Sequence, residues 1–263
     1  MIFISISLAV HNLSVSYDTT SVVNSASFSV GGGQLVGIIG PNGAGKSSLM
    51  GAMLGLIKPS SGQVQFGTVP LSQARHRISY VKQKADHDLT FPIRVKDVVM
   101  MGLYHQQGFF KWATKAHKQQ VLHALEQVDM AAYANTQIAK LSGGQLQRVF
   151  MARVLLQNPD YVFLDEPFAA IDASSEQQLM VLLRRMRDQG KLIVMVHHDL
   201  KQVDQYFDQV ILLNKRVYAA GDTHTTFTKE NLLSTYNDPL LDLLSGTATK
   251  TATPTLQLLG GVS

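Results

Sequence analysis

The run Gly40-Pro41-Asn42-Gly43-Ala44-Gly45-Lys46-Ser47 matches the pattern G-x-x-x-x-G-K-[ST]. The apolar segment Gln34–Ile39 before it is typical of a buried parallel strand, and residues 48–54 after it are typical of the start of a helix. In this context the glycines let backbone N–H groups curl around phosphate oxygens. We therefore predict a nucleoside triphosphate site in which Lys46 reaches the β- and γ-phosphates and Ser47 ligates Mg²⁺. The alternative interpretation is a glycine-rich turn before an ordinary helix.

The composition is that of a globular protein. The chain has 263 residues, of which 45% are hydrophobic and 16% are charged, so it can bury a sizeable core in one or two domains. The formal net charge is only +4 and no Lys/Arg cluster resembles a binding patch, so we expect no nucleic-acid partner. The sequence has no cysteine, which excludes disulfides, thiolate metal sites and cysteine nucleophiles, and fits a reducing compartment.

The hydropathy pattern predicts no membrane-spanning segment. No apolar run approaches the roughly 20 residues that a helix needs to cross a bilayer. The first ten residues lack a basic region and lead directly into strand-like alternation, so we interpret them as a first strand rather than as a signal peptide. Any role at a membrane is therefore expected to go through a partner protein.

The periodicity of apolar residues changes twice along the chain. Residues 8–30 alternate as an antiparallel β region does, and residues 84–148 show helical spacing instead. Buried strands then return at residues 161–164, 192–196 and 210–213. We predict one α/β domain over residues 1–246, with a catalytic core formed by 1–83 and 149–246, a helical insertion at 84–148, and a disordered tail at 247–263.

The middle of the predicted insertion is rich in aromatic residues. Tyr104, Phe109, Phe110 and Trp112 fall within nine positions. Two interpretations stay open: these rings complete a small core of the insertion itself, or they form a surface for a partner.

Two acidic residues follow the strand at 161–164. Asp165 suits a carboxylate that holds Mg²⁺ through water, and Glu166 suits a base that polarises the attacking water. Paired acids after a strand can also be a helix cap or a salt-bridged loop. The triphosphate loop upstream favours the catalytic interpretation.

A second glycine-rich motif precedes a helix, at Leu141-Ser142-Gly143-Gly144-Gln145. Small residues at a helix N-terminus form an anion site, and the alternative is a simple helix cap. One nucleotide does not need two such sites. The second site is therefore expected to serve the nucleotide of another subunit, in a head-to-tail dimer with ATP between the subunits.

These motifs together resemble the nucleotide-binding subunits of ATP-binding-cassette (ABC) transporters. Six motifs match in order across residues 8–220. The resemblance implies a P-loop NTPase (RecA-like) fold of α/β class, with a mostly parallel sheet, an N-terminal antiparallel β subdomain and a helical insertion subdomain. It also implies ATP hydrolysis with Mg²⁺ as cofactor.

The same resemblance implies roles for individual residues. Tyr17 would stack on adenine, although a strand core residue is the alternative, and Gln83 would ligate Mg²⁺ and sense the γ-phosphate. The motif at residues 141–145 would contact the partner's γ-phosphate, and His198 would be the switch histidine. The ATP site would thus contain Tyr17, residues 40–47, Ser48 and Gln83, and the Mg²⁺ ligands would be Ser47, Gln83 and Asp165.

One motif departs from the family pattern. Asp172 lies on the family's dimer-contact loop, which here reads Ala169-Ala170-Ile171-Asp172 rather than Ser-Ala-Leu-Asp.

Beside the switch position, His197, His198 and Asp199 are also candidates for a transition-metal site. Adjacent residues at a strand end point to opposite sides, which argues against a shared coordination shell.

A finer resemblance concerns the transported cargo. Residues 91–102, 108–110 and 227–233 look like those of manganese, zinc and chelated-iron importer ATPases. This implies an importer of a divalent transition metal ion (Mn, Zn or Fe), with siderophore or haem importers as the alternative and a soluble, non-transport ABC ATPase as a further one. The implied partners are a second cassette in a homodimer, a membrane permease and, indirectly, an extracytoplasmic solute-binding protein. The expected location is peripheral, on the cytoplasmic face of the inner or plasma membrane.

Overall fold

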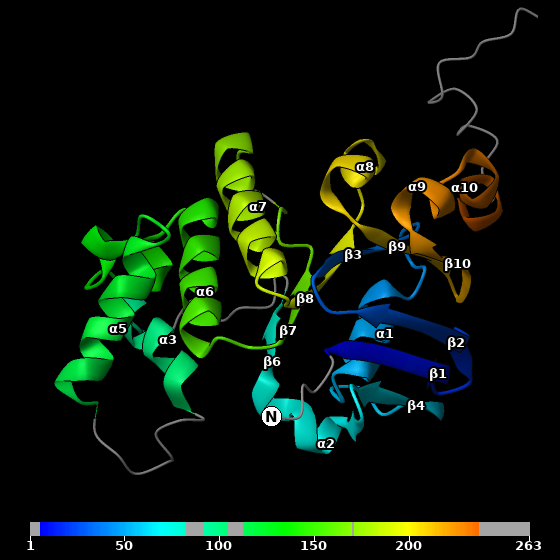
Figure 1. Cartoon of the computed structure of the whole chain (residues 1–263), viewed down its shortest axis with the longest axis horizontal. Helices are drawn as coiled ribbons and strands as arrows, with labels where there is room; N and C mark the ends of the chain where they lie inside the picture. Colours follow the sequence, from blue (N-terminus) through cyan, green and yellow to red (C-terminus); the bar gives the residue numbers. More distant parts are fainter. Residues whose placement is uncertain (1–5, 83–91, 105–112, 170, 237–263) are drawn as a thin grey trace, which may run out of the picture.

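The computed structural model describes residues 6–82, 92–104, 113–169 and 171–236. The strands form two β-sheets, and α1 (Lys46–Met53) lies between them (Figure 1). One sheet has the strand order β2-β1-β4-β5 and the other has the order β10-β9-β3-β8-β7-β6. The first sheet consists of β1 (Ser7–Tyr17), β2 (Thr20–Gly31), β4 (Ser61–Phe66) and β5 (Val69–Pro70).

The six-stranded sheet positions the site. Its strands are β3 (Gln34–Ile39), β6 (Ile78–Val81), β7 (Tyr161–Asp165), β8 (Leu192–His197), β9 (Gln209–Asn214) and β10 (Arg216–Asp222). The pairs β3–β8, β3–β9, β6–β7 and β7–β8 are parallel, and only β10 pairs in the antiparallel sense. Parallel strands need crossover connections, which the intervening helices provide.

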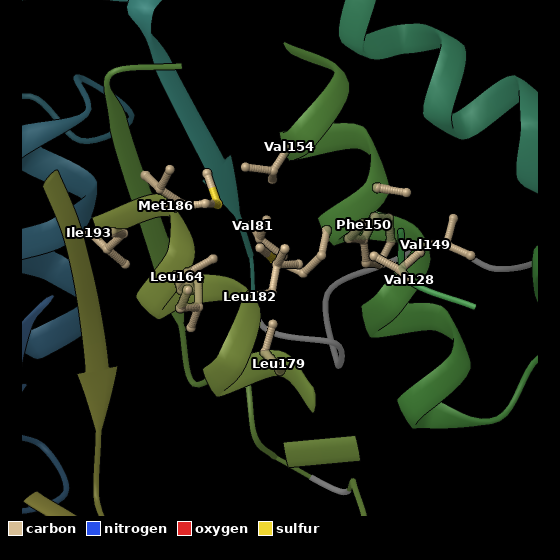
Figure 2. Close-up of a cluster of buried hydrophobic side chains, with 14 of the residues drawn as sticks. Val81, Val128, Val149, Phe150, Val154, Leu164, Leu179, Leu182, Met186 and Ile193 are labelled. Carbon is tan, nitrogen blue, oxygen red and sulfur yellow. The ribbon is translucent and has the colours of Figure 1, made fainter. Parts of the chain in front are cut away.

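Both faces of this sheet are buried at its central strands β3, β7, β8 and β9, which are almost continuously apolar. On β7, Val162 and Leu164 face one hydrophobic cluster while Tyr161 and Phe163 face the other. The first cluster lies under α6 (Gly143–Gln157) and α7 (Ala173–Asp188). Figure 2 shows these contacts, with Phe150 and Leu182 of the two helices directed toward the strands. The second cluster lies between the two sheets and includes α1 (Lys46–Met53).

The segment between β6 and β7 is helical in its described parts. It contains α3 (Val95–Met100), η3 (Met101–Leu103), α5 (Lys115–Glu126), η4 (Ala131–Tyr133), η5 (Ile138–Lys140) and α6. α3 and α5 pack on α6 and lie to one side of the sheets (Figure 1). The remaining short elements are α2 (Leu71–Ala74), η1 (Arg75–Arg77), η6 (Leu200–Gln202), α8 (Val203–Tyr206), α9 (Thr223–Thr226) and α10 (Lys229–Tyr236).

The structure confirms the predicted α/β class, with one antiparallel sheet and one mostly parallel sheet. It corrects the sequence interpretation at two points. β1 begins at Ser7, so residue 6 lies before the first strand, and the weaker strand β10 follows the last strong strand that the sequence predicts, at 210–213. β10 was missed because its residues are mostly half-buried at a sheet edge and their hydropathy pattern is weak.

Some expectations lie outside the described residues. These are Gln83, the aromatic residues Phe109, Phe110 and Trp112, and the tail at 247–263. Tyr104 is described and is exposed. The division into a core and an insertion at residues 84 and 148 stays a prediction. Within the described ranges, no helix has both the length and the apolar character to cross a membrane.

Candidate functional site

The sequence motifs converge because they follow neighbouring parallel strands. β3, β8, β7 and β6 are adjacent in that order, and all run in the same direction. The phosphate loop follows β3, His198 follows β8, Asp165 ends β7, and Glu166 comes directly after it. Gln83 comes after β6 but lies outside the described part of the chain. The carboxyl edge of an open parallel sheet is where such folds bind ligands.

The phosphate loop needs glycine where neighbouring backbone comes close. Gly45 has φ of +92°, and a Cβ atom there would lie 2.5 Å from the carbonyl oxygen of Val22. A Cβ atom on Gly40 would overlap the carbonyl oxygen of Leu213. Only glycine takes the first conformation without strain, and only glycine leaves room at the second position. The backbone of β2 and β9 therefore packs tightly against the phosphate loop. No local sequence pattern indicates these contacts.

Lys46 is buried at the start of α1, with its ammonium group turned back onto the loop. Its Nζ donates to the carbonyl oxygens of Gly40 and Pro41, at 2.8 and 2.9 Å. Burial lowers the pKa of Lys46, and the charges of Glu166 and Asp165 oppose that shift. The ammonium group thus lies within electrostatic reach of both acids.

Ser47 and Asp165 meet at the base of the site. Ser47 Oγ donates to Asp165 Oδ1 at 3.4 Å, and Asp165 is 6% exposed. A hydroxyl and a carboxylate oxygen are the ligand types that Mg²⁺ prefers. The donor set therefore fits Mg²⁺.

Glu166 adopts a backbone conformation that is rare for its type. Its φ is +46°, in the left-handed region, and the side chain is half-buried. A non-glycine residue in that region costs about 1 kcal/mol, and such strain gathers at functional sites. The turn directs the chain away from β7 immediately after Asp165.

Tyr17 ends β1 beside the phosphate loop. It is 48% exposed, so it does not fill a core, and its hydroxyl lies 3.3 Å from Ser48 Oγ. An exposed ring beside the loop is available to stack on a flat ligand.

The motif at residues 141–145 forms the N-terminus of α6. Ser142 is the N-cap, and it shares a capping box with Gln145: Gln145 N donates to Ser142 Oγ at 3.2 Å and Ser142 N donates to Gln145 Oε1 at 2.9 Å. Ser142 is exposed, whereas Leu141 packs on the core. Among the hydrogen bonds of the described residues, none joins this motif to the phosphate loop. Its role toward the nucleotide of a second subunit stays a prediction.

Asp172 caps the neighbouring helix α7. Its carboxylate accepts from the backbone N–H of Ser175 at 3.0 Å and from the Ser175 hydroxyl at 2.8 Å. These bonds, the backbone one foremost, lower the pKa of Asp172. Asp172 itself is exposed, so its remaining lone pairs are open to another molecule.

The two adjacent histidines at the end of β8 differ in burial. His197 is 3% exposed, and its ring packs against Phe168, Tyr206 and Phe207, with centroids 5.5–6.0 Å apart. His198 is exposed, although its ring centroid lies 5.9 Å from that of His197. Within the described ranges no group of three or more His, Asp or Glu residues could hold a metal ion.

The aromatic packing around His197 was missed at the level of sequence. Phe168, Tyr206 and Phe207 come from two segments that share no motif with the histidine. Tyr206 also donates through its hydroxyl to Glu176 Oε1 of α7 at 2.8 Å. The only available signal was the apolar strand before His197, which predicts burial at its end.

Comparison with known proteins agrees with this geometry. The family model described as "ABC transporter" matches residues 23–169, more than half of the chain. The manganese transport system ATP-binding protein MntB of Listeria monocytogenes is 46% identical over 91% of this chain and 100% of its own length. The chelated iron transport system membrane protein YfeB of Yersinia pestis is 41% identical over 94% of this chain and 85% of its own.

A solved structure is similar as well. The dimeric bacterial ABC transporter cassette MJ0796 has a TM-score of 0.73 and 25% sequence identity, over 82% of this chain and 98% of its own.

Proposed function

The chain belongs to the ABC transporter family, whose ATP-binding subunits hydrolyse ATP, and we propose that it powers the import of a divalent transition metal ion. The observation that carries the cargo class is the 46% identity to a manganese transport ATP-binding protein along that protein's whole length. Manganese is therefore the first candidate, with zinc and iron as the others. The similarity to a chelated-iron system favours iron as the second candidate.

The proposed ATP site uses the edge described above. The loop amides of residues 40–47 and the ammonium group of Lys46 would hold the phosphates, and Tyr17 would stack on adenine. Mg²⁺ would be held by Ser47, by Gln83 and, through water, by Asp165, and it would neutralise charge on the β- and γ-phosphates. Burial of Lys46 between carbonyl oxygens supports this role, because a triphosphate would replace those acceptors with stronger ones.

The proposed hydrolysis step depends on positioning. Glu166 would accept a hydrogen bond from the attacking water and align it with the γ-phosphorus atom, while His198 would touch the γ-phosphate. The left-handed turn at Glu166 and the exposure of His198 support this arrangement. Negative charge that develops on the equatorial oxygens would be stabilised by Lys46 and by donors from the second subunit.

The second subunit is proposed to be an identical chain. Its residues 141–145 would cover the γ-phosphate, and Asp172 would contact the facing loop across the interface. The exposure of Ser142 and Asp172 supports this, as does the dimeric form of the similar cassette MJ0796. Closure on two ATP molecules and opening after hydrolysis would move a membrane permease, which receives metal from an extracytoplasmic solute-binding protein. The chain would thus lie peripherally on the cytoplasmic face of the inner or plasma membrane.

The decisive experiment is ATP-dependent uptake of Mn²⁺, Zn²⁺ and Fe²⁺ into proteoliposomes that contain the chain with its permease and binding protein. We expect uptake of at least one of these ions, which Glu166→Gln abolishes. ATP-dependent uptake of a siderophore or of haem instead, with none of the three ions transported, would overturn the cargo class but leave the ATPase assignment intact. Co-purification with ribosomes or DNA in place of a permease would overturn the transport role.

A further inference from the structure

The two loops that face the second subunit in the proposed dimer touch one another within a single chain. α6 and α7 lie side by side (Figure 1), and their first turns meet at Gly144 and Ser175. A Cβ atom on Gly144 would lie 2.6 Å from Ser175 Oγ, 3.1 Å from Ser175 Cβ and 3.5 Å from Asp172 Oδ2. The start of α6 therefore packs against the Ser175 hydroxyl and against the Asp172 carboxylate to which that hydroxyl donates.

The side chain of Ser175 contacts both partners of this junction, Asp172 and Gly144. It is 7% exposed, and its hydroxyl donates to Asp172 Oδ2 at 2.8 Å while its backbone N–H donates to Asp172 Oδ1 at 3.0 Å. An ordinary N-cap needs only the backbone bond. The hydroxyl bond fixes the second carboxylate oxygen, so the rotation of the Asp172 side chain is set by the same atom that Gly144 packs against.

We propose that Ser175 is a positioning residue for ATP hydrolysis, which sets the Asp172 carboxylate and the signature loop at residues 141–145 in one fixed arrangement. The inference rests on the proposed function, because it assumes that both loops meet the nucleotide and the loops of a second subunit. A displacement of either loop on dimer closure is transmitted to the other through the Ser175 hydroxyl. Close-packed side chains transmit such shifts because they leave no space to absorb them.

The kinetic test compares Ser175→Ala, Ser175→Thr and Ser174→Ala. We expect Ser175→Ala to lower kcat by about five-fold with an unchanged KM for ATP, since it releases the Asp172 carboxylate at the proposed dimer interface and leaves the phosphate loop intact. Ser175→Thr keeps the hydroxyl and is expected to restore at least half of the wild-type kcat. Ser174 is an exposed serine in the same turn, so Ser174→Ala is the matched control and should retain wild-type kinetics.

A second test examines the contact itself by thermal unfolding. Gly144→Ala places its methyl group against Ser175 Oγ and is expected to lower the Tm. Adding Ser175→Ala removes that oxygen, so the double variant should unfold at a higher temperature than Gly144→Ala alone. Lack of this rescue, or a wild-type kcat in Ser175→Ala, would overturn the inference.

A dimerisation assay distinguishes failure of this inference from failure of the proposed function. In the Glu166→Gln background, ATP should convert the chain to a dimer, as measured by analytical ultracentrifugation, and Ser175→Ala should weaken that dimer. If the chain with Glu166→Gln alone stays monomeric with ATP, the proposed function fails. If it dimerises and Ser175→Ala dimerises equally well, only the positioning role fails.

Discussion

The hydroxyl of Ser47 lies 3.4 Å from Oδ1 of Asp165, although 118 positions separate the two residues in the sequence. The contact joins the first turn of α1 to the last residue of β7 across the strand β8 that lies between β3 and β7. Two oxygen atoms that can ligate a metal ion, one from each of two distant segments, thus lie together near the buried ammonium group of Lys46.

This pair predicts how hydrolysis depends on magnesium. Asp165→Asn keeps the size of the side chain but removes the negative charge that holds the hydrated ion. We expect the Mg²⁺ concentration for half-maximal ATPase activity to rise about ten- to hundred-fold, and chelation by EDTA to abolish the activity of the wild-type chain. A magnesium titration of phosphate release measures this. Asp188→Asn, on an exposed carboxylate at the end of α7, serves as the control and should leave the titration unchanged.

The position of Glu166 predicts a variant that binds ATP but does not turn it over. Glu166→Gln keeps the shape of the side chain and cannot accept the proton from water, so we expect kcat to fall by about 10²- to 10⁴-fold. ATP binding should persist, and the dimer should accumulate in size-exclusion chromatography with ATP and Mg²⁺. Undiminished phosphate release in this variant would contradict the assignment of the base.

His197 predicts a loss of stability in acid. Burial foremost, and then the neighbouring His198, lower the pKa of His197 from its ordinary value of 6.5, while Asp199 and Glu176 raise it. The unfolded chain therefore binds a proton that the folded chain excludes, so stability is complete above pH 6.5 and falls as the pH drops below that value.

His197→Phe suits the surrounding aromatic rings and removes this proton. If protonation costs about 1 kcal/mol, the Tm of the wild type should fall about 2–4 °C further than that of the variant between neutral and mildly acidic pH. Differential scanning calorimetry over a pH series measures the difference. His123→Gln, on an exposed histidine of α5, should show the wild-type profile; equal slopes for the wild type and His197→Phe would refute the prediction.

The crowding at Gly40 predicts a large cost for a small substitution. A methyl group there would overlap the carbonyl oxygen of Leu213, which is backbone and cannot rotate away. We expect Gly40→Ala to lower the free energy of unfolding by about 2–3 kcal/mol in urea denaturation. Gly31→Ala is the matched control, since a Cβ atom at Gly31 meets nothing within 4 Å and its effect should stay within about 0.5 kcal/mol.

Much of the site could be predicted from local pattern. The phosphate loop was predicted because strand, glycines, lysine and serine are consecutive, and all of its determinants lie within about twenty residues. Asp165 and Glu166 were predicted because a buried strand ends in two acids. The role of Gln83 stays a prediction.

Other features depend on residues that meet only after folding. The weakly patterned edge strand β10 was not predicted, because its residues are held by pairing with β9 more than by their own hydropathy. The burial of His197 beside the exposed His198 follows from the rings of Phe168, Tyr206 and Phe207, which reach it from other segments.

The sequence by itself therefore determined the alternation of strand and helix and the chemical identity of the nucleotide loop, because both depend on neighbours along the chain. Only the tertiary structure decided that Leu213 leaves no room beside Gly40 and that Ser175 joins Asp172 to Gly144. These contacts depend on which strands lie next to each other and how closely the helices pack on them. Contacts this close depend on how the whole core packs, so the sequence of any single segment does not specify them.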